Sequence, residues 1–262
     1  MIKKIIDRVG LRALHICEHT GHFVLFFLKA LATLFTTRLH TKHVLAHMES
    51  IGVQSLIIVF LTGSFTGLAL ALQSYIGFNR LGAEEFVGLV VTLGMARELG
   101  PVLTGLMATG RCGSAMAAEI GTMRITEQID ALKTLRVNPF RYLIVPRIVA
   151  STLMLPFLSV FGMMCGIVSG YLYSVYALGI NAESYIAIVQ ERIALSDITG
   201  GLIKAAFFGL FLSWVGTFEG YETRGGARGV GNATTRSVVA GSIIILVANY
   251  FLSSLLFQTG VA

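Results

Sequence analysis

Long apolar stretches alternate with short charged segments along this chain. Residues 50–79 carry no charged side chain and predict a first membrane-spanning helix. Four further apolar stretches predict spans at residues 86–110, 148–182, 198–218 and 237–260. Because a helix rises about 1.5 Å per residue, the 148–182 stretch should tilt or project beyond the bilayer. The pattern predicts an all-α polytopic membrane protein, with residues 1–262 forming one membrane domain.

The first 48 residues follow a different pattern. Residues 23–37 are apolar but short, and Lys29 interrupts them. Basic and histidine side chains flank this stretch: Arg8, Arg12, His15, His22, Arg38, His40 and Lys42. This arrangement favours a helix lying in the membrane interface over a sixth span, with the histidines at headgroup level rather than in a metal site. The basic N-terminus runs into no apolar core with a cleavage site, so no signal peptide is expected.

Two charged residues, Arg97 and Glu98, stand in the middle of the second predicted span. A central charge costs roughly 2.5–3.5 kcal/mol on insertion scales, so each must face protein, water or a polar ligand. Neighbours on a helix point about 100° apart, so each residue needs its own partner. Pro101 cannot donate to the carbonyl of residue 97 and should kink the helix there. A structural ion pair and a role in binding or gating both remain open.

Other intramembrane positions are less specific. Lys204 lies near enough to the outer end of the fourth span to reach the interface, so snorkelling and function are both open. Small residues recur at four-residue spacing and let helices approach closely, although packing within one subunit explains each motif alone. These glycines are Gly63, Gly67, Gly162, Gly166 and Gly170.

Composition and charge agree with a membrane protein. The chain is 55% hydrophobic and 13% charged, against about 25% charged residues in soluble domains. Sixteen Lys and Arg residues fall before the first span or in the loops 111–147 and 218–236, whereas only Arg80 and Arg192 lie on the other side. The bias predicts a cytoplasmic N-terminus and an outer C-terminus. The basic loops also account for the net charge of +6, so this charge does not indicate a nucleic-acid-binding protein. The three cysteines are scattered and imply no disulfide framework.

A short amphipathic helix is predicted at residues 126–136 in the cytoplasmic loop. Thr126 can cap it, and Asn138-Pro139 stops it. Acids precede bases, as the helix dipole favours: Glu127, Asp130, Lys133 and Arg136. Ile129, Leu132 and Leu135 form an apolar stripe. Such a helix is a docking element, or otherwise an interfacial anchor without a partner.

No motif for nucleotide hydrolysis or nucleophilic catalysis is present in the sequence. The loop 219–236 is rich in glycine and basic residues, but no GxxxxGK[ST], GxSxG or HExxH occurs. We therefore expect a transport protein rather than an enzyme. A stand-alone proton-coupled secondary transporter using Glu98 is the alternative, and an intramembrane lipid-modifying enzyme is a third possibility.

Two stretches closely resemble the MlaE-type permease family: ARELGPVLTGLMATGRCGSAMAAEIGTMRITEQIDALKTLRVNP and EGYETRGGARGVGNATTRSVV. The resemblance covers the chain from about residue 45, and EQIDAL is its most specific block. It implies a homodimeric permease of an ABC transporter in the inner membrane, working with a cytosolic ATPase dimer, an outer ring of MCE proteins and often a STAS-domain protein. The implied cargo is glycerophospholipid moving between inner and outer membranes. ATP and Mg would be used by the ATPase, and this chain would bind no cofactor.

The resemblance also implies roles for particular residues. The 126–136 helix would be the coupling helix, with ATPase contacts from Glu127, Gln128, Ile129, Asp130 and Leu132. Arg97, Glu98 and Lys204 match polar positions near the family's lipid pocket at the dimer interface. Some members carry an acid in the last span where this chain has Asn249, so a charge partner there for Lys204 or Arg97 cannot be assumed.

Overall fold

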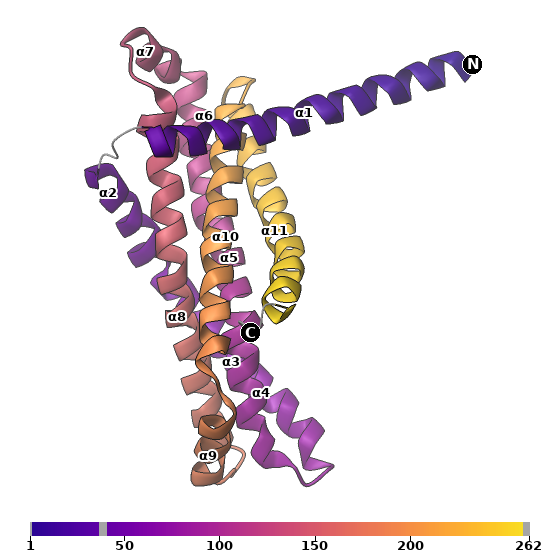
Figure 1. Cartoon of the computed structure of the whole chain (residues 1–262), viewed down its shortest axis with the longest axis vertical. Helices are drawn as coiled ribbons and strands as arrows, with labels where there is room; N and C mark the ends of the chain where they lie inside the picture. Colours follow the sequence, from indigo (N-terminus) through magenta and orange to yellow (C-terminus); the bar gives the residue numbers. More distant parts are fainter. Residues whose placement is uncertain (1, 37–40, 259–262) are drawn as a thin grey trace.

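The computed structural model describes residues 2–36 and 41–258, and this part of the chain contains helices and no strand. Five helical units are long and apolar enough to cross a membrane: Thr41–Asn79, Glu84–Ile125, Phe140–Tyr176, Leu195–Tyr221 and Gly226–Leu256. They form an elongated bundle whose axis is vertical in Figure 1. The predicted all-α class with five spans is therefore confirmed.

Irregular turns interrupt three of these units. The first comprises α2 (Thr41–Gly52), the 3₁₀ turn η1 (Val53–Ser55) and α3 (Leu56–Asn79). The second comprises η2 (Glu84–Phe86), α4 (Val87–Gly94), η3 (Met95–Leu99), α5 (Gly100–Ala108), η4 (Thr109–Gly113) and α6 (Ser114–Ile125), with η3 and η4 being π-helical. The third comprises the π-helical η5 (Phe140–Ile144) and α8 (Val145–Tyr176). The last two are α10 (Leu195–Tyr221) and α11 (Gly226–Gln258).

Two segments that the sequence places in loops are largely helical. The second unit continues to Ile125 instead of ending at residue 110, because Arg111 is satisfied inside the bundle: its guanidinium donates to the Ser50 carbonyl (3.0 Å) and the Ser55 hydroxyl (2.7 Å). Between α10 and α11 only a short turn remains of the predicted loop 219–236, with Gly225 at φ 89°. The third helix occupies 140–176 rather than 148–182.

The predicted 126–136 helix is shorter than expected, and its apolar side packs against the same chain. The helix α7 spans Gln128–Thr134, and Thr126 does not cap it, because its hydroxyl donates back to the Thr122 carbonyl of α6 (2.8 Å). Ile129 is fully buried and Leu132 is partly buried against the same chain's Phe140 cluster. Only Leu135 of the predicted stripe is strongly exposed, at 72%. The apolar stripe therefore anchors α7 to its own bundle.

The N-terminal helix α1 (Ile2–Thr36) crosses one end of the bundle (Figure 1). Phe23 and Phe27 stack on Trp214 of α10, with ring centroids 4.1 and 4.2 Å apart, and the Trp214 indole donates to the Phe23 carbonyl (3.2 Å). This crossing orientation agrees with the interfacial helix expected from the sequence. Arg38 and His40 lie outside the described residues.

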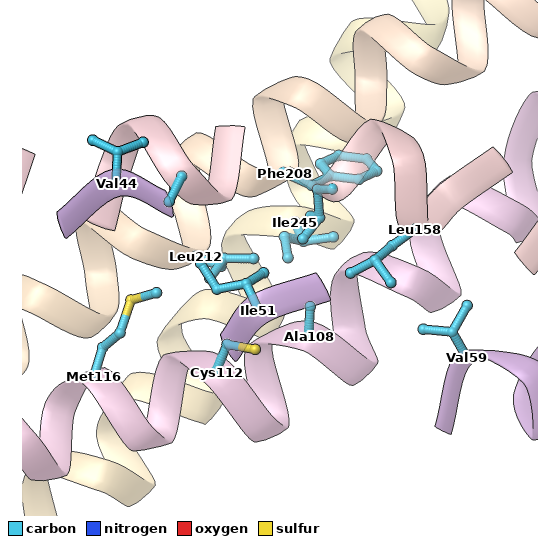
Figure 2. Packing of buried hydrophobic residues seen from close by; sticks show 12 residues of the cluster. Val44, Ile51, Val59, Ala108, Cys112, Met116, Leu158, Phe208, Leu212 and Ile245 are labelled. Carbon is cyan, nitrogen blue, oxygen red and sulfur yellow. The ribbon is translucent and has the colours of Figure 1, made fainter. Parts of the chain in front are cut away.

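Close helix contacts hold the bundle together. The glycine motifs of α3 and α8 face each other, and a Cβ at Gly63 would lie 2.6 Å from the Gly162 carbonyl oxygen. A buried cluster joins α5, α8, α10 and α11 through residues such as Leu158, Phe208 and Ile245 (Figure 2). At the bundle's far end from α7 lies α9 (Ala182–Arg192) (Figure 1). This packing fixes the second membrane helix against α10 and α11.

Candidate functional site: a charged cluster between three membrane helices

A π-helical turn positions the charged pair of the second membrane helix. In η3 the Gly100 amide donates to the Met95 carbonyl, five residues back. A π turn contains more residues than an α turn, so successive side chains diverge less, and such turns are frequent at functional sites. Arg97 and Glu98 accordingly line the same pocket. The irregularity expected beside Pro101 is thus a π turn immediately before it.

Arg97 is paired with Asp197 at the start of α10. Its Nε donates to Asp197 Oδ1 (2.7 Å), and its Nη2 donates to the same oxygen. The other oxygen, Oδ2, accepts from the backbone amide of Ala194 (2.9 Å), so one carboxylate both caps α10 and orients the guanidinium. Asp197 was not predicted as a site residue, because it lies just outside the predicted span 198–218. Its side chain is 1% exposed.

Glu98 accepts hydrogen bonds from α10 and α11. Lys204 Nζ (2.7 Å) and Ser253 Oγ (2.9 Å) donate to Oε1, and Asn249 Nδ2 donates to Oε2 (2.8 Å). The Lys204 side chain is 3% exposed, so it points into the bundle and does not snorkel to the interface. Asn249 thus contributes a donor where an acid would contribute a charge. Ser253 gave no signal in the sequence, because isolated serines are common in membrane helices.

The cluster encloses a pocket of about 190 Å³. Its walls are Arg97, Glu98, Asp197, Gly200, Gly201, Lys204 and Ser253. Two cations and two carboxylates alternate here, with Asp197 and Lys204 buried behind Arg97 and Glu98, whose side chains are each 43% exposed. The exposed guanidinium and carboxylate can bind polar groups of a ligand. The arrangement is suited to recognition.

The predicted ATPase-contacting residues form a separate group on α7, at one end of the bundle (Figure 1). Glu127, Gln128 and Asp130 are exposed, whereas Ile129 is buried. Asp130 accepts from Lys133 (2.8 Å) and from Arg124 of α6 (3.1 Å). The bond from Lys133 lowers the pKa of Asp130 and also raises the pKa of Lys133, so both stay ionised at neutral pH.

Comparisons with known proteins identify similar sequences. The family described as Permease MlaE matches residues 44–255. A probable ABC transporter permease protein of Rickettsia conorii is 42% identical over 258 residues, covering 98% of this chain and 100% of that protein. The intermembrane phospholipid transport system permease protein MlaE of Haemophilus influenzae is 36% identical, covering 99% of this chain and 100% of that protein. The chloroplastic protein TRIGALACTOSYLDIACYLGLYCEROL 1 of Arabidopsis thaliana is 38% identical, covering 94% of this chain and 69% of that protein.

Proposed function

This chain belongs to the MlaE permease family, and on that premise we propose that it moves glycerophospholipids between the inner and outer membranes of a diderm envelope, maintaining outer-membrane lipid asymmetry. Its family is one of ABC transporter permeases, so the chain is a multi-pass transport subunit rather than an enzyme. The name of the Haemophilus influenzae relative supports the phospholipid cargo.

The observation that carries the proposal is the half-exposed guanidinium of Arg97 in a membrane-embedded pocket. A guanidinium presents a planar fork of donors that matches a phosphate group. The neighbouring helix α11 offers large apolar side chains for acyl tails, including Leu246, Tyr250 and Phe251, which are 53–72% exposed. A phospholipid satisfies both surfaces at once.

The alternative of a stand-alone secondary transporter is less well supported. A proton-coupling carboxylate exchanges its proton during transport, whereas Glu98 is held by hydrogen bonds from Lys204, Asn249 and Ser253. In addition, the permease of an ABC transporter is driven by a separate ATPase, so this chain would not need a proton gradient. The intramembrane lipid-modifying enzyme has no support from the site.

The partners in the proposal follow from the two ends of the bundle. The exposed edge of α7 would bind the cytosolic ATPase dimer, which would use ATP and Mg, while this chain would bind no cofactor itself. The outer end of the bundle would bind the ring of MCE proteins. A STAS-domain protein would be a further subunit of the same transporter. A second copy of the chain would complete the lipid pocket along α11. Only 11% of the most apolar segment of this helix is buried within its own chain, so the rest is available to a partner. The chain would lie in the inner membrane with its N-terminus cytoplasmic and its C-terminus periplasmic.

Purification with the partner ATPase tests this function. The complex should retain phospholipid detectable by mass spectrometry, and reconstituted complex should transfer labelled phospholipid to an acceptor only when ATP is hydrolysed. A hydrolysis-deficient ATPase is the matched control. A chain that purifies alone, or transfer that continues with the deficient ATPase, contradicts the proposal.

A further inference from the structure

We propose that this pocket selects zwitterionic glycerophospholipids whose headgroup carries an ammonium with N–H groups, with the phosphate bound by Arg97 and an ammonium N–H donating to Glu98. The inference rests on the proposed function and narrows its substrate class. It follows from the arrangement of charges in the pocket, from the free hydrogen-bonding positions and from the net charge of the site.

The four charges form two ion pairs of opposite direction. In the Arg97–Asp197 pair the cation is the more exposed partner, and in the Glu98–Lys204 pair the carboxylate is. The outer residues are Arg97 and Glu98, each 43% exposed, and they stand next to each other on the π turn. Behind them lie the inner residues Asp197 and Lys204, 1% and 3% exposed. A ligand in the pocket therefore meets a positive group beside a negative one. A phosphate linked to an ammonium carries the complementary pair of charges.

Both outer residues keep hydrogen-bonding capacity for a ligand. A guanidinium has five N–H donors, and Arg97 directs Nε and Nη2 to Asp197, leaving Nη1 without an acceptor among the described residues. A carboxylate has about four acceptor positions. Glu98 fills three of these with Lys204, Ser253 and Asn249, so one remains for an ammonium N–H.

The net charge of the cluster disfavours an anionic lipid. Two cations and two carboxylates sum to zero, and Asn249 adds no charge. Burial of an uncompensated charge away from water is costly. A zwitterionic headgroup keeps the occupied site neutral, whereas an anionic headgroup makes it negative and leaves Glu98 without a cationic partner from the ligand.

Lipid retention from defined membranes tests the selectivity. The complex of this chain with its ATPase is assembled in nanodiscs containing equal amounts of phosphatidylethanolamine and phosphatidylglycerol with identical acyl chains, and the lipid that remains bound after extraction is measured by mass spectrometry. We expect phosphatidylethanolamine to be enriched about tenfold, the effect of one charge-assisted hydrogen bond. Phosphatidylcholine, which is zwitterionic but has no ammonium N–H, should be retained less than phosphatidylethanolamine.

Two variants separate charge from folding. Glu98→Gln makes the cluster positive and should shift retention towards phosphatidylglycerol. If that variant is unstable, Glu98→Gln with Lys204→Met removes both charges and keeps the cluster neutral. The preference for phosphatidylethanolamine should then fall several-fold, since the ammonium has no carboxylate partner, but part of it should remain because an anionic headgroup still leaves the occupied site charged.

The outcomes distinguish this inference from the function on which it rests. Wild-type complex that retains both lipids in the nanodisc ratio, equal retention of phosphatidylcholine and phosphatidylethanolamine, or an unchanged preference in the double variant overturns the selectivity while leaving phospholipid transport intact. Wild-type complex that retains no phospholipid overturns both.

Discussion

The ammonium of Lys204 lies 2.8 Å from the backbone carbonyl oxygen of Arg97, an acceptor that Pro101 cannot serve because proline has no N–H. A side chain from α10 thus satisfies the irregular turn of the second membrane helix. Gly201 makes the approach possible, since a Cβ there would lie 2.9 Å from Met163 Cε and would also collide with the Ala96 carbonyl. The charged cluster and the π turn therefore depend on each other.

Replacing Lys204 by Met should destabilise the protein. Breaking a buried ion pair costs about 3–5 kcal/mol, and we expect the lower end because the Glu98 side chain is 43% exposed. The thermal unfolding midpoint in detergent measures the loss. Lys204→Met combined with Glu98→Gln is the matched control and should recover part of the stability, because it removes the unpaired carboxylate but leaves the Arg97 carbonyl without its Lys204 donor. A double variant no more stable than the single one contradicts this pairing.

The contact between α3 and α8 should not tolerate a methyl group at Gly63. Its Cβ would lie 2.6 Å from the Gly162 carbonyl oxygen, so Gly63→Ala must separate two helices. Overpacking of this kind costs typically about 1–3 kcal/mol. Gly77→Ala in the same helix is the control, because within the described residues no atom outside the adjacent helical backbone lies within 4 Å of its Cβ position. Equal unfolding midpoints for the two variants would show that the close approach is unimportant.

Charge reversal on α7 should weaken ATPase binding. Glu127→Lys with Asp130→Lys reverses two acidic charges at the N-terminus of α7, where the helix dipole favours negative charge. It also places a new cation between Arg124 and Lys133, both of which bind Asp130 in the wild type. The ATPase recovered with the affinity-purified permease should fall several-fold. The control is Glu183→Lys with Glu191→Lys on α9, at the opposite end of the bundle. Unchanged recovery together with unchanged lipid-stimulated ATPase activity would remove α7 from the coupling role.

Cysteines on the exposed side of α11 should crosslink two permease copies. Val247 and Phe251 are 53% and 65% exposed, and a two-fold axis would bring identical positions together. The experiment uses native membranes and a chain whose three cysteines are replaced by Ala. Ile245→Cys, at a fully buried position of the same helix, should give no dimer. Monomer alone at all positions, in an active transporter, would exclude a pocket between two copies along α11.

The sequence reveals the site residues whose chemistry conflicts with their surroundings. Arg97, Glu98 and Pro101 are conspicuous because charges and proline are costly within a membrane helix. The sequence does not indicate the roles of Asp197 and Arg111 for one reason: a charged residue at either edge of an apolar stretch predicts the boundary of a span. In the structure other helices supply their partners, Arg97 for Asp197 and Ser50 for Arg111, so the helix continues.

The orientation of local elements was harder to predict. The π turn at 95–99 depends on a shifted hydrogen-bond register that five residues cannot reveal through periodicity. The sequence predicts the apolar stripe containing Ile129 and Leu132 correctly, but it does not indicate whether the stripe packs against the same chain or against another protein. The tertiary contacts of α7 decide this question.

The role of Arg97 in holding a phospholipid headgroup can be measured as the amount of phospholipid per purified complex, determined beside the melting temperature. The suitable variant is Arg97→Ala with Asp197→Asn, because removal of Arg97 alone would leave the Asp197 carboxylate buried without its cation. We expect a several-fold loss of bound phospholipid at a melting temperature within a few degrees of wild type. Normal lipid content in the surviving protein, together with a large fall in melting temperature, would contradict this role and identify the cluster as structural.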